Sequence, residues 1–154
     1  MNNCSIIIPH YNNASIILNC LKSLHKYTLS NHEIIVVDNA SSDNSVQLIK
    51  EEFDKVLIIE NNVNLGYAGG CNLGVTKAKN DFLIFLNNDT EVTENWITPL
   101  IDSLKNDKIS SVQPKIKNLT DKNYFDYAGA SGGFIDIFCY PFCRGRIFNT
   151  TEKD

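Results

Sequence analysis

Cys4 to Pro9 reads CSIIIP, a short apolar run rich in β-branched residues that ends at a proline. A run that does not alternate apolar with polar residues predicts a strand buried on both faces of a parallel sheet. The same pattern occurs at Glu33 to Asp38 (EIIVVD), at Val56 to Ile59 and at Asp81 to Leu86 (DFLIFL). We therefore expect four strands of one buried sheet.

Each of these runs is followed by residues with helical spacing, in which apolar side chains recur three and four positions apart. The expected helices run from Ala14 to Leu24, from a cap at Ser41 or Ser42 to about Phe53, from about Gly70 to Ala78, and from Thr98 to Leu104. Four strand-then-helix units in succession predict an α/β fold of Rossmann-like type. Its central sheet should be mostly parallel, with helices on both faces.

Ile109 to Ile116 is expected to form a fifth strand. After about Asn118 the periodicity fades into a tail rich in glycine and aromatic residues, which we expect to form irregular strands and loops. A chain of 154 residues has room for one compact core and not for two ordinary ones. We expect residues 1–117 to form that core and residues 118–154 to begin a second, truncated region.

The composition argues against several classes of protein. Hydrophobic residues make up 43% and charged residues 21% of the chain, values close to those of soluble globular proteins. No apolar run approaches the ~20 residues of a membrane-spanning helix, and the amino terminus lacks the features of a signal peptide. The net charge of -4 argues against a nucleic-acid partner, which would require clustered lysine and arginine. We expect a cytoplasmic protein.

The five cysteines do not suggest a disulfide framework. Their number is odd and their positions are scattered, which fits a reducing compartment. Cys139 and Cys143 form the only close pair, and the three histidines lie far from them in the sequence. A zinc site at this pair is an alternative, but buried thiols are the simpler interpretation.

Residues just after the predicted strands are candidate ligand-binding residues, because ligands bind beyond the carboxyl ends of strands in open parallel sheets. They are residues 9–12, 38–42, 61–70 and 87–89, and they should meet in space. Asp38 can accept a hydrogen bond from a base or ribose. Asp89 can bind a hard cation together with phosphate oxygens. Each carboxylate taken alone is also explained as an ordinary turn residue, and for Asp38 that explanation is the simpler one.

Residues 64–74 (NLGYAGGCNLG) combine several glycines with the start of a helix. Glycine lets a backbone approach a ligand closely, and a helix N-terminus favours anions. The spacing matches neither the dinucleotide-binding fingerprint nor a P-loop. Close packing of the helix on the sheet explains Gly74 better than it explains Gly66, Gly69 and Gly70 together.

Four segments resemble glycosyltransferase family 2 in order and spacing. They are residues 6–13 (IIIPHYNN), 36–43 (VVDNASSD), 64–74 and 85–89 (FLNND). The likeness covers about residues 4–116, and it is closest to the rhamnosyltransferase-like bacterial members that build surface polysaccharides. It implies a GT-A fold and an enzyme that takes its sugar from a nucleotide-sugar donor.

The resemblance also implies a role for each matching residue. The nucleoside would contact Pro9, Tyr11 and Asp38, and the nucleotide-sugar pocket would be lined by Asn64, Gly66, Gly70 and Asn72. Asn87-Asn88-Asp89 takes the place of the family's Asp-x-Asp motif. Asp89 would therefore bind Mn²⁺ or Mg²⁺, and Asn88 would lie near the ribose or sugar. Asparagine at the first motif position removes one negative charge, which should weaken metal binding in the absence of the diphosphate.

The implied reaction is an inverting transfer from a UDP-, dTDP- or GDP-sugar to a saccharide or lipid-linked acceptor. A lipid-linked acceptor would place the full-length protein at the inner face of the membrane. The family's general base is an Asp or Glu well downstream of the metal motif, and neither Asp126 nor Asp136 sits in a recognisable base motif. We therefore expect the base to lie outside this chain, and we assign no catalytic residue.

Two other functions compete with this one. A non-catalytic nucleotide-sugar-binding module would explain the missing base. Nucleotidyltransferase chemistry on a similar architecture would require a glycine-rich loop with a basic residue after the first strand, where this chain has Pro9-His10-Tyr11-Asn12. The sequence therefore favours the first alternative over the second.

Overall fold

The computed structural model describes residues 3–28, 31–126, 133–135, 137, 141–143, 146–147 and 150–151. The chain divides into two compact units, Met1–Ile97 and Thr98–Asp154. The predicted division of the chain into a core of residues 1–117 and the start of a second region at residues 118–154 is a division by function. It stays a prediction. Among the described residues, no helix is long and apolar enough to cross a membrane.

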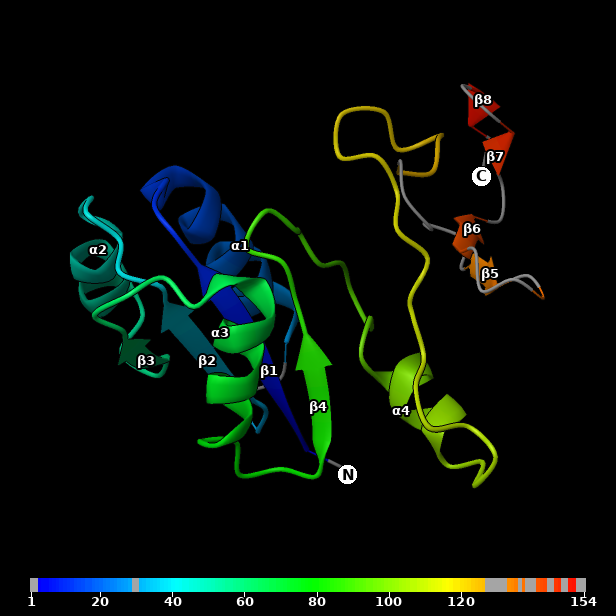
Figure 1. The fold of residues 1–154 in the computed structure, drawn as a ribbon, viewed down its shortest axis with the longest axis horizontal. Helices are drawn as coiled ribbons and strands as arrows, with labels where there is room; N and C mark the ends of the chain where they lie inside the picture. Colours follow the sequence, from blue (N-terminus) through cyan, green and yellow to red (C-terminus); the bar gives the residue numbers. More distant parts are fainter. Residues whose placement is uncertain are drawn as a thin grey trace. The chain divides into compact units, whose positions relative to one another are not determined.

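The first unit is an α/β layer structure, as predicted (Figure 1). Its elements are β1 (Cys4–His10), α1 (Ala14–Tyr27), β2 (Glu33–Asp38), α2 (Ser45–Glu52), β3 (Leu57–Glu60), α3 (Gly66–Val75) and β4 (Phe82–Phe85). The strands form one parallel sheet in the order β3-β2-β1-β4. The chain therefore moves outward from β1 to β3 and then returns to the other side of β1, which makes the gap between β1 and β4 the topological switch point.

The two faces of the sheet are covered by different helices. Ile7, Ile35 and Val37 form a fully buried cluster on the face where α3 packs, with Leu73 of α3 against it. Neighbouring residues in a strand point to opposite faces. Ile6 and the other buried strand residues that alternate with this cluster therefore lie on the other face. Figure 1 shows α3 in front of the sheet and α1 behind it. The predicted placement of helices on both faces is confirmed.

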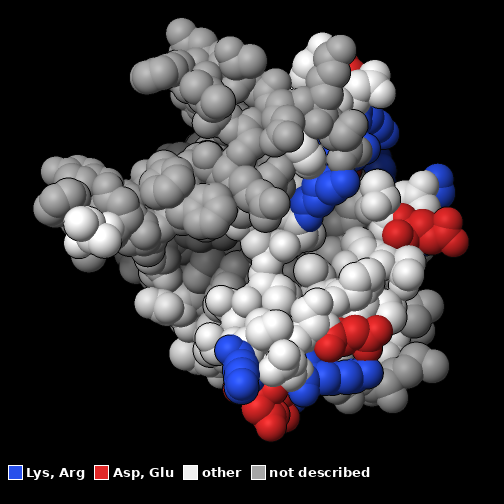
Figure 2. Space-filling model, turned by 90° about the vertical axis from the view of Figure 1, so that its right-hand side faces the viewer, with Lys and Arg blue, Asp and Glu red and all other residues white. Residues whose placement is uncertain are grey.

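The second unit contains α4 (Thr98–Leu104) and two antiparallel strand pairs. The strands are β5 (Gly133–Ile135), β6 (Pro141–Cys143), β7 (Arg146–Ile147) and β8 (Thr150–Thr151). The start of α4 at Thr98 agrees with the sequence. On the face shown in Figure 2, the acidic and basic side chains of the described residues are interspersed and do not form one continuous basic surface.

Three predicted elements differ from the structure. The expected fifth strand, Ile109 to Ile116, is wrong: most of it is exposed irregular chain, because half of its residues are polar and Pro114 has no N–H for a strand ladder. The helix α3 begins four residues before the predicted Gly70. The strand β4 is not fully buried, since it lies at the sheet edge and Phe85 is 49% exposed.

The start of α2 is a fourth difference, because neither Ser41 nor Ser42 caps this helix. The helix begins at Ser45, whose backbone N–H donates to Asp43 Oδ1 at 3.1 Å. Ser41 and Ser42 instead bind Asn12, in the loop after β1. Their hydrogen-bonding groups are therefore used to hold two loops together.

Three cysteines are buried free thiols, as the simpler interpretation predicted. They are Cys4, Cys20 and Cys71. Burial raises the pKa of the Cys4 thiol to about 11 and that of Cys20 to about 12, so both stay protonated and unreactive at neutral pH. Cys139 and the side chain of Cys143 lie outside the described residues, so the zinc alternative is untested.

A prediction on acid stability arises at the amino edge of the sheet, where Glu33 accepts hydrogen bonds from Ser5 Oγ at 2.8 Å and from the Lys79 N–H at 3.0 Å. Burial alone would raise the pKa of Glu33, but these bonds and the Lys79 ammonium together lower it. A carboxyl group whose pKa is lower in the folded than in the unfolded state stabilises the fold at pH values above the unfolded-state pKa. This stabilisation is lost as the pH falls through the folded-state pKa. We expect Glu33→Gln to lower stability by about 1 kcal/mol at neutral pH and to flatten its decline below about pH 4.5.

Chemical unfolding of both proteins at several pH values measures this effect. Glu94→Gln, at an exposed position, is the matched control and should follow the wild-type curve. Identical pH dependence in the wild type and Glu33→Gln would contradict the prediction.

Candidate functional site

The carboxyl ends of the strands meet at one edge of the first unit, and hydrogen bonds join the loops that leave them. The Asn39 N–H donates to the His10 carbonyl at 2.8 Å, which connects the ends of β2 and β1. Asn12 continues this connection: its N–H donates to Ser41 Oγ, and its Oδ1 accepts the Ser42 N–H, both at 2.8 Å. The predicted meeting of residues 9–12 with residues 38–42 is therefore observed.

Asn39 connects these loops to α3 and β3. The residue is 3% exposed, its Nδ2 donates to the Gly66 carbonyl at 3.2 Å, and its Oδ1 accepts a hydrogen bond from Asn61 at 3.1 Å. Gly70 lies directly against it: a Cβ at Gly70 would be 3.0 Å from Asn39 Nδ2 and 3.1 Å from Pro9 Cβ. Pro9 and Gly70, two of the predicted site residues, are therefore neighbours.

The other predicted residues of the glycine stretch lie on α3 or just before it. Asn64 is exposed, and its Oδ1 accepts the Gly66 N–H at 2.8 Å. Gly66 has φ 68°, a left-handed conformation that glycine adopts without strain, and it begins the helix. Asn72 is exposed on α3. The structure thus gives Asn64 and Gly66 a part in starting the helix, whose N-terminal N–H groups favour an anion.

Asp38 is buried at the end of β2, with 4% of its surface exposed. Its Oδ2 accepts the Ser41 N–H at 3.1 Å, which is the turn role that the sequence allowed. Its Oδ1 is buried and has no hydrogen-bond partner among the described residues. Buried carboxylate oxygens nearly always have a donor, so this unsatisfied oxygen is a candidate acceptor for an N–H or O–H group of a ligand.

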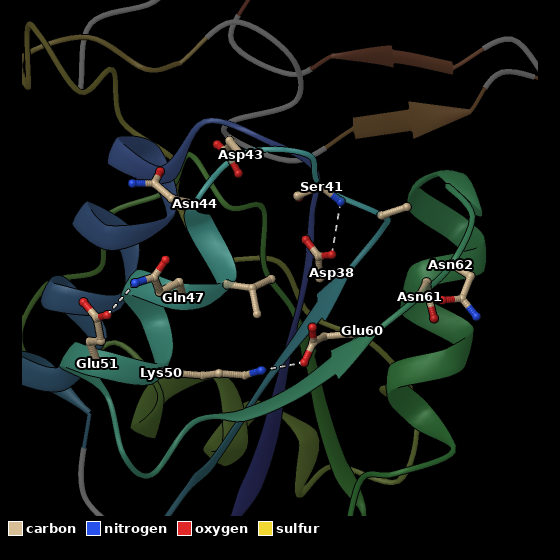
Figure 3. A pocket seen from close by; sticks show the side chains of 12 residues that line it. Asp38, Ser41, Asp43, Asn44, Gln47, Lys50, Glu51, Glu60, Asn61 and Asn62 are labelled. Carbon is tan, nitrogen blue, oxygen red and sulfur yellow. Dashed lines mark hydrogen bonds and ion pairs between the residues drawn. The ribbon is translucent and has the colours of Figure 1, made fainter.

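A pocket of about 770 Å³ opens beside Asp38, between α2 and the loop after β3 (Figure 3). Its charged lining is mostly acidic, with Asp43, Glu51 and Glu60 beside Asp38. Its lysine, Lys50, is paired with Glu60 at 2.7 Å. Such a lining repels a diphosphate but tolerates an uncharged base or sugar. Of the predicted site residues, only Asp38 lines this pocket.

The turn after β4 presents the second carboxylate. The Thr90 N–H donates to the Asn87 carbonyl at 3.2 Å, and Asp89 between them is exposed. Asn88 is half-buried, and its Nδ2 lies 2.9 Å from His10 Nδ1. Burial lowers the pKa of His10 even though Asp38 and Asp43 oppose the shift, so the ring is neutral at physiological pH. Tyr11, which follows His10, is 52% exposed at the same edge.

The donor set at this edge fits a divalent cation only in part. Among the described residues, no group of three or more His, Cys, Asp or Glu side chains could hold a metal ion. Asp89 is nevertheless exposed, and no hydrogen bond or ion pair engages its carboxylate within the described part of the chain. A single carboxylate suits Mg²⁺ or Mn²⁺ when phosphate oxygens and water complete the coordination.

The family model described as Glycosyl transferase family 2 matches residues 5–148. The chain belongs to glycosyltransferase family 2. The match extends beyond residues 4–116, where the sequence resemblance was placed. The predicted likeness to rhamnosyltransferase-like members stays a prediction.

Named glycosyltransferases and solved structures resemble the chain over most of its length. Glycosyltransferase GlyG of Streptococcus pneumoniae is 29% identical over 151 residues, which cover 96% of this chain and 46% of GlyG. S. aureus TarS 1-349 in complex with UDP has a TM-score of 0.57 and 26% identity, covering 68% of this chain and 31% of that one. The mannosyltransferase PcManGT from Pyrobaculum calidifontis, in complex with GDP-Man and Mn²⁺, shares the fold, with a TM-score of 0.60 and 20% identity over 74% of this chain and 33% of its own. This chain spans less than half the length of each.

Two residues of this family 2 domain lie inside the predicted segments but were given no role of their own. His10 and Asn39 both lie directly after or at the end of a strand, inside segments that the resemblance quoted, and both are buried polar residues. Their position was the available signal, but their partners are 22 to 78 residues away in sequence. The candidate base Asp126 is exposed in the second unit, and Asp136 lies outside the described residues.

Proposed function

We propose that this family 2 domain binds a nucleoside-diphosphate sugar at the carboxyl edge of its sheet and transfers the sugar to an acceptor. The observation that carries the proposal is the unpartnered buried oxygen of Asp38 at the same edge as the exposed carboxylate of Asp89. The two lie on either side of β1, at the ends of β2 and β4. This gives separate places for the base and for the diphosphate.

The base is expected to bind at Asp38. An ionised carboxylate only accepts hydrogen bonds, so Oδ1 would select bases with a ring N–H at their pairing edge. Uracil, thymine and guanine have this group, whereas cytosine and adenine carry an acceptor at that ring position and only an exocyclic amino donor beside it. Tyr11 is exposed beside the strand end and offers an aromatic face for stacking. We therefore propose a UDP-, dTDP- or GDP-sugar as donor.

The diphosphate is expected to lie between the N-terminus of α3 and the turn after β4. The helix N-terminus stabilises negative charge, and the close packing of Gly70 against Pro9 and Asn39 holds this helix at the ends of β1 and β2. The Asp89 carboxylate would hold Mn²⁺ or Mg²⁺ against the phosphates. Such an ion offsets the negative charge that develops on the leaving group.

The transfer would invert the anomeric configuration, with an acceptor hydroxyl attacking in line from the side opposite the diphosphate. We propose a saccharide or lipid-linked acceptor and a cytoplasmic location at the inner face of the membrane. The support for these points is the family membership together with the sequence resemblance. No residue at this edge is assigned as the general base.

The proposal predicts which nucleotides bind. Calorimetry in the presence of Mn²⁺ should show binding of at least one of UDP, dTDP and GDP, and much weaker binding of CDP and ADP. Asp38→Asn should weaken the preferred nucleotide about tenfold, because asparagine offers one acceptor oxygen where the base and the Ser41 N–H each require one.

Asp54→Asn is the matched control, since Asp54 is exposed before β3, at the opposite edge of the sheet. It removes the same charge and should leave affinity unchanged. If the folded protein binds none of the three nucleotides, the proposed function is wrong. If it binds CDP or ADP as tightly as UDP, the role of Asp38 is wrong.

A further inference from the structure

His10 and Asn88 join the two strands that border the topological switch point. His10 is the last residue of β1 and is 1% exposed, and Asn88 lies in the turn after β4. With its proton on Nε2, the neutral ring can accept a hydrogen bond at Nδ1, where Asn88 Nδ2 lies at 2.9 Å. The contact therefore connects the end of a fully buried strand to a half-exposed turn.

The turn has few other anchors. The Leu86 N–H before it donates to the Ile7 carbonyl at 3.0 Å, and the Val92 N–H after it donates to Ser23 Oγ at 3.0 Å. Between these points, within the described part of the chain, the bond to His10 is the one hydrogen bond made by a side chain of Asn87, Asn88 or Asp89. The turn backbone is held by the Thr90 N–H, which donates to the Asn87 carbonyl, and by Cys20 Sγ, which lies 3.9 Å from that carbonyl. The bond to His10 adds the side-chain contact that restrains Asn88, the residue directly before Asp89.

A structural role alone does not account for an imidazole at this position. The His10 Nε2 atom is buried and has no hydrogen-bond partner among the described residues. An unpartnered buried polar atom lowers stability, so an apolar ring of similar size would suit the packing better. What the imidazole has and an apolar ring lacks among the described residues is the contact of its Nδ1 atom with Asn88.

We propose that His10 is a positioning residue for donor binding: its ring holds Asn88 and thereby fixes the turn that presents Asp89 to the diphosphate. This inference rests on the proposed function of the site. Ordering a turn in advance removes the entropy cost that the ligand would otherwise meet on binding. The benefit should appear in the metal-dependent part of nucleotide affinity, because the base is held separately at Asp38.

A double-mutant cycle tests the proposal with His10→Phe, Asn88→Ala and the combined variant. The affinity of each for the preferred nucleotide is measured with Mn²⁺ and with chelator, and the ratio is the metal increment. We expect His10→Phe and Asn88→Ala each to reduce the increment about tenfold, and the combined variant to lose no more than either. Affinity in chelator and the melting temperature should not fall in His10→Phe.

Two further variants sharpen the result. His10→Gln can still accept a hydrogen bond from Asn88 and should keep most of the increment. His25→Phe removes an exposed imidazole near the far end of α1 and should behave as wild type. Should His10→Phe not fold, His10→Leu replaces it in the cycle.

The outcomes separate this inference from the function on which it rests. A wild-type increment in His10→Phe, or a loss of about a hundredfold in the combined variant, would overturn the positioning role while leaving the proposed function in place. Absence of any nucleotide binding by the wild type would overturn both.

Discussion

Asp89→Ala is expected to lower nucleotide affinity about 100-fold in the presence of Mn²⁺ and to leave affinity in chelator nearly unchanged. Asp89 supplies the exposed carboxylate of the turn after β4, and the first position of the motif is the uncharged Asn87. Removing the carboxylate therefore leaves the motif Asn87-Asn88-Asp89 without a charge to hold the cation. Calorimetry with and without Mn²⁺ measures the loss.

The control for this variant lies at the other end of the same strand. Asp81 is exposed just before β4, so Asp81→Ala removes the same charge far from the proposed diphosphate. It should bind as the wild type does. Because Asp89 is exposed, its replacement should change the free energy of unfolding by less than about 0.5 kcal/mol. An unchanged metal increment in a folded Asp89→Ala protein would refute the metal role.

Gly74→Ala is expected to destabilise the domain by about 3 kcal/mol, or roughly 6 to 12 °C in melting temperature. A Cβ at Gly74 would lie 2.4 Å from Ile7 Cγ2 and 3.2 Å from Val37 Cγ2. Both contacts are with β-branched side chains of the fully buried cluster under α3, which have little freedom to move. The helix would have to lift from the sheet. Chemical and thermal unfolding measure the change.

The clash itself can be tested by making room for the added methyl group. Ile7→Ala deletes the atom that the new Cβ would meet, so the double variant with Gly74→Ala should be more stable than the sum of the two single effects predicts. Additive losses would show that the destabilisation comes from elsewhere. A Gly74→Ala protein as stable as the wild type would contradict the close packing altogether.

Most of the fold follows from local patterns in the sequence. All four strands of the sheet were located to within one residue at each end, because a short apolar run is a strong signal. The predicted start of the helix α1 at Ala14 is confirmed. The sequence pattern predicted the wrong structure where a residue could form more than one kind of interaction. Ser41 and Ser42 are good helix caps, but both bind Asn12 of another loop. Ile109 to Ile116 is polar enough, and broken by Pro114, to remain irregular.

The candidate site also contains some residues that could be identified from the sequence and others that could not. Asp38 and Asp89 could be identified because their position depends only on where a strand ends. The roles of His10 and Asn39 could not be identified from the sequence, because the role of a buried polar side chain depends on the residues to which it is hydrogen-bonded. Those partners, Asn88 for one and Asn61 with Gly66 for the other, come from distant segments.

By itself, the sequence determined the α/β class, the order of strands and helices along the chain, and the family to which the chain belongs. These properties depend on the apolar periodicity and on motifs that are read within a few residues. Only the tertiary structure decided that β1 lies between β2 and β4, which brings Asp38 and Asp89 to either side of it. The physical reason is that strand pairing and the partners of buried polar groups are set by packing between distant segments, on which local propensity has no influence.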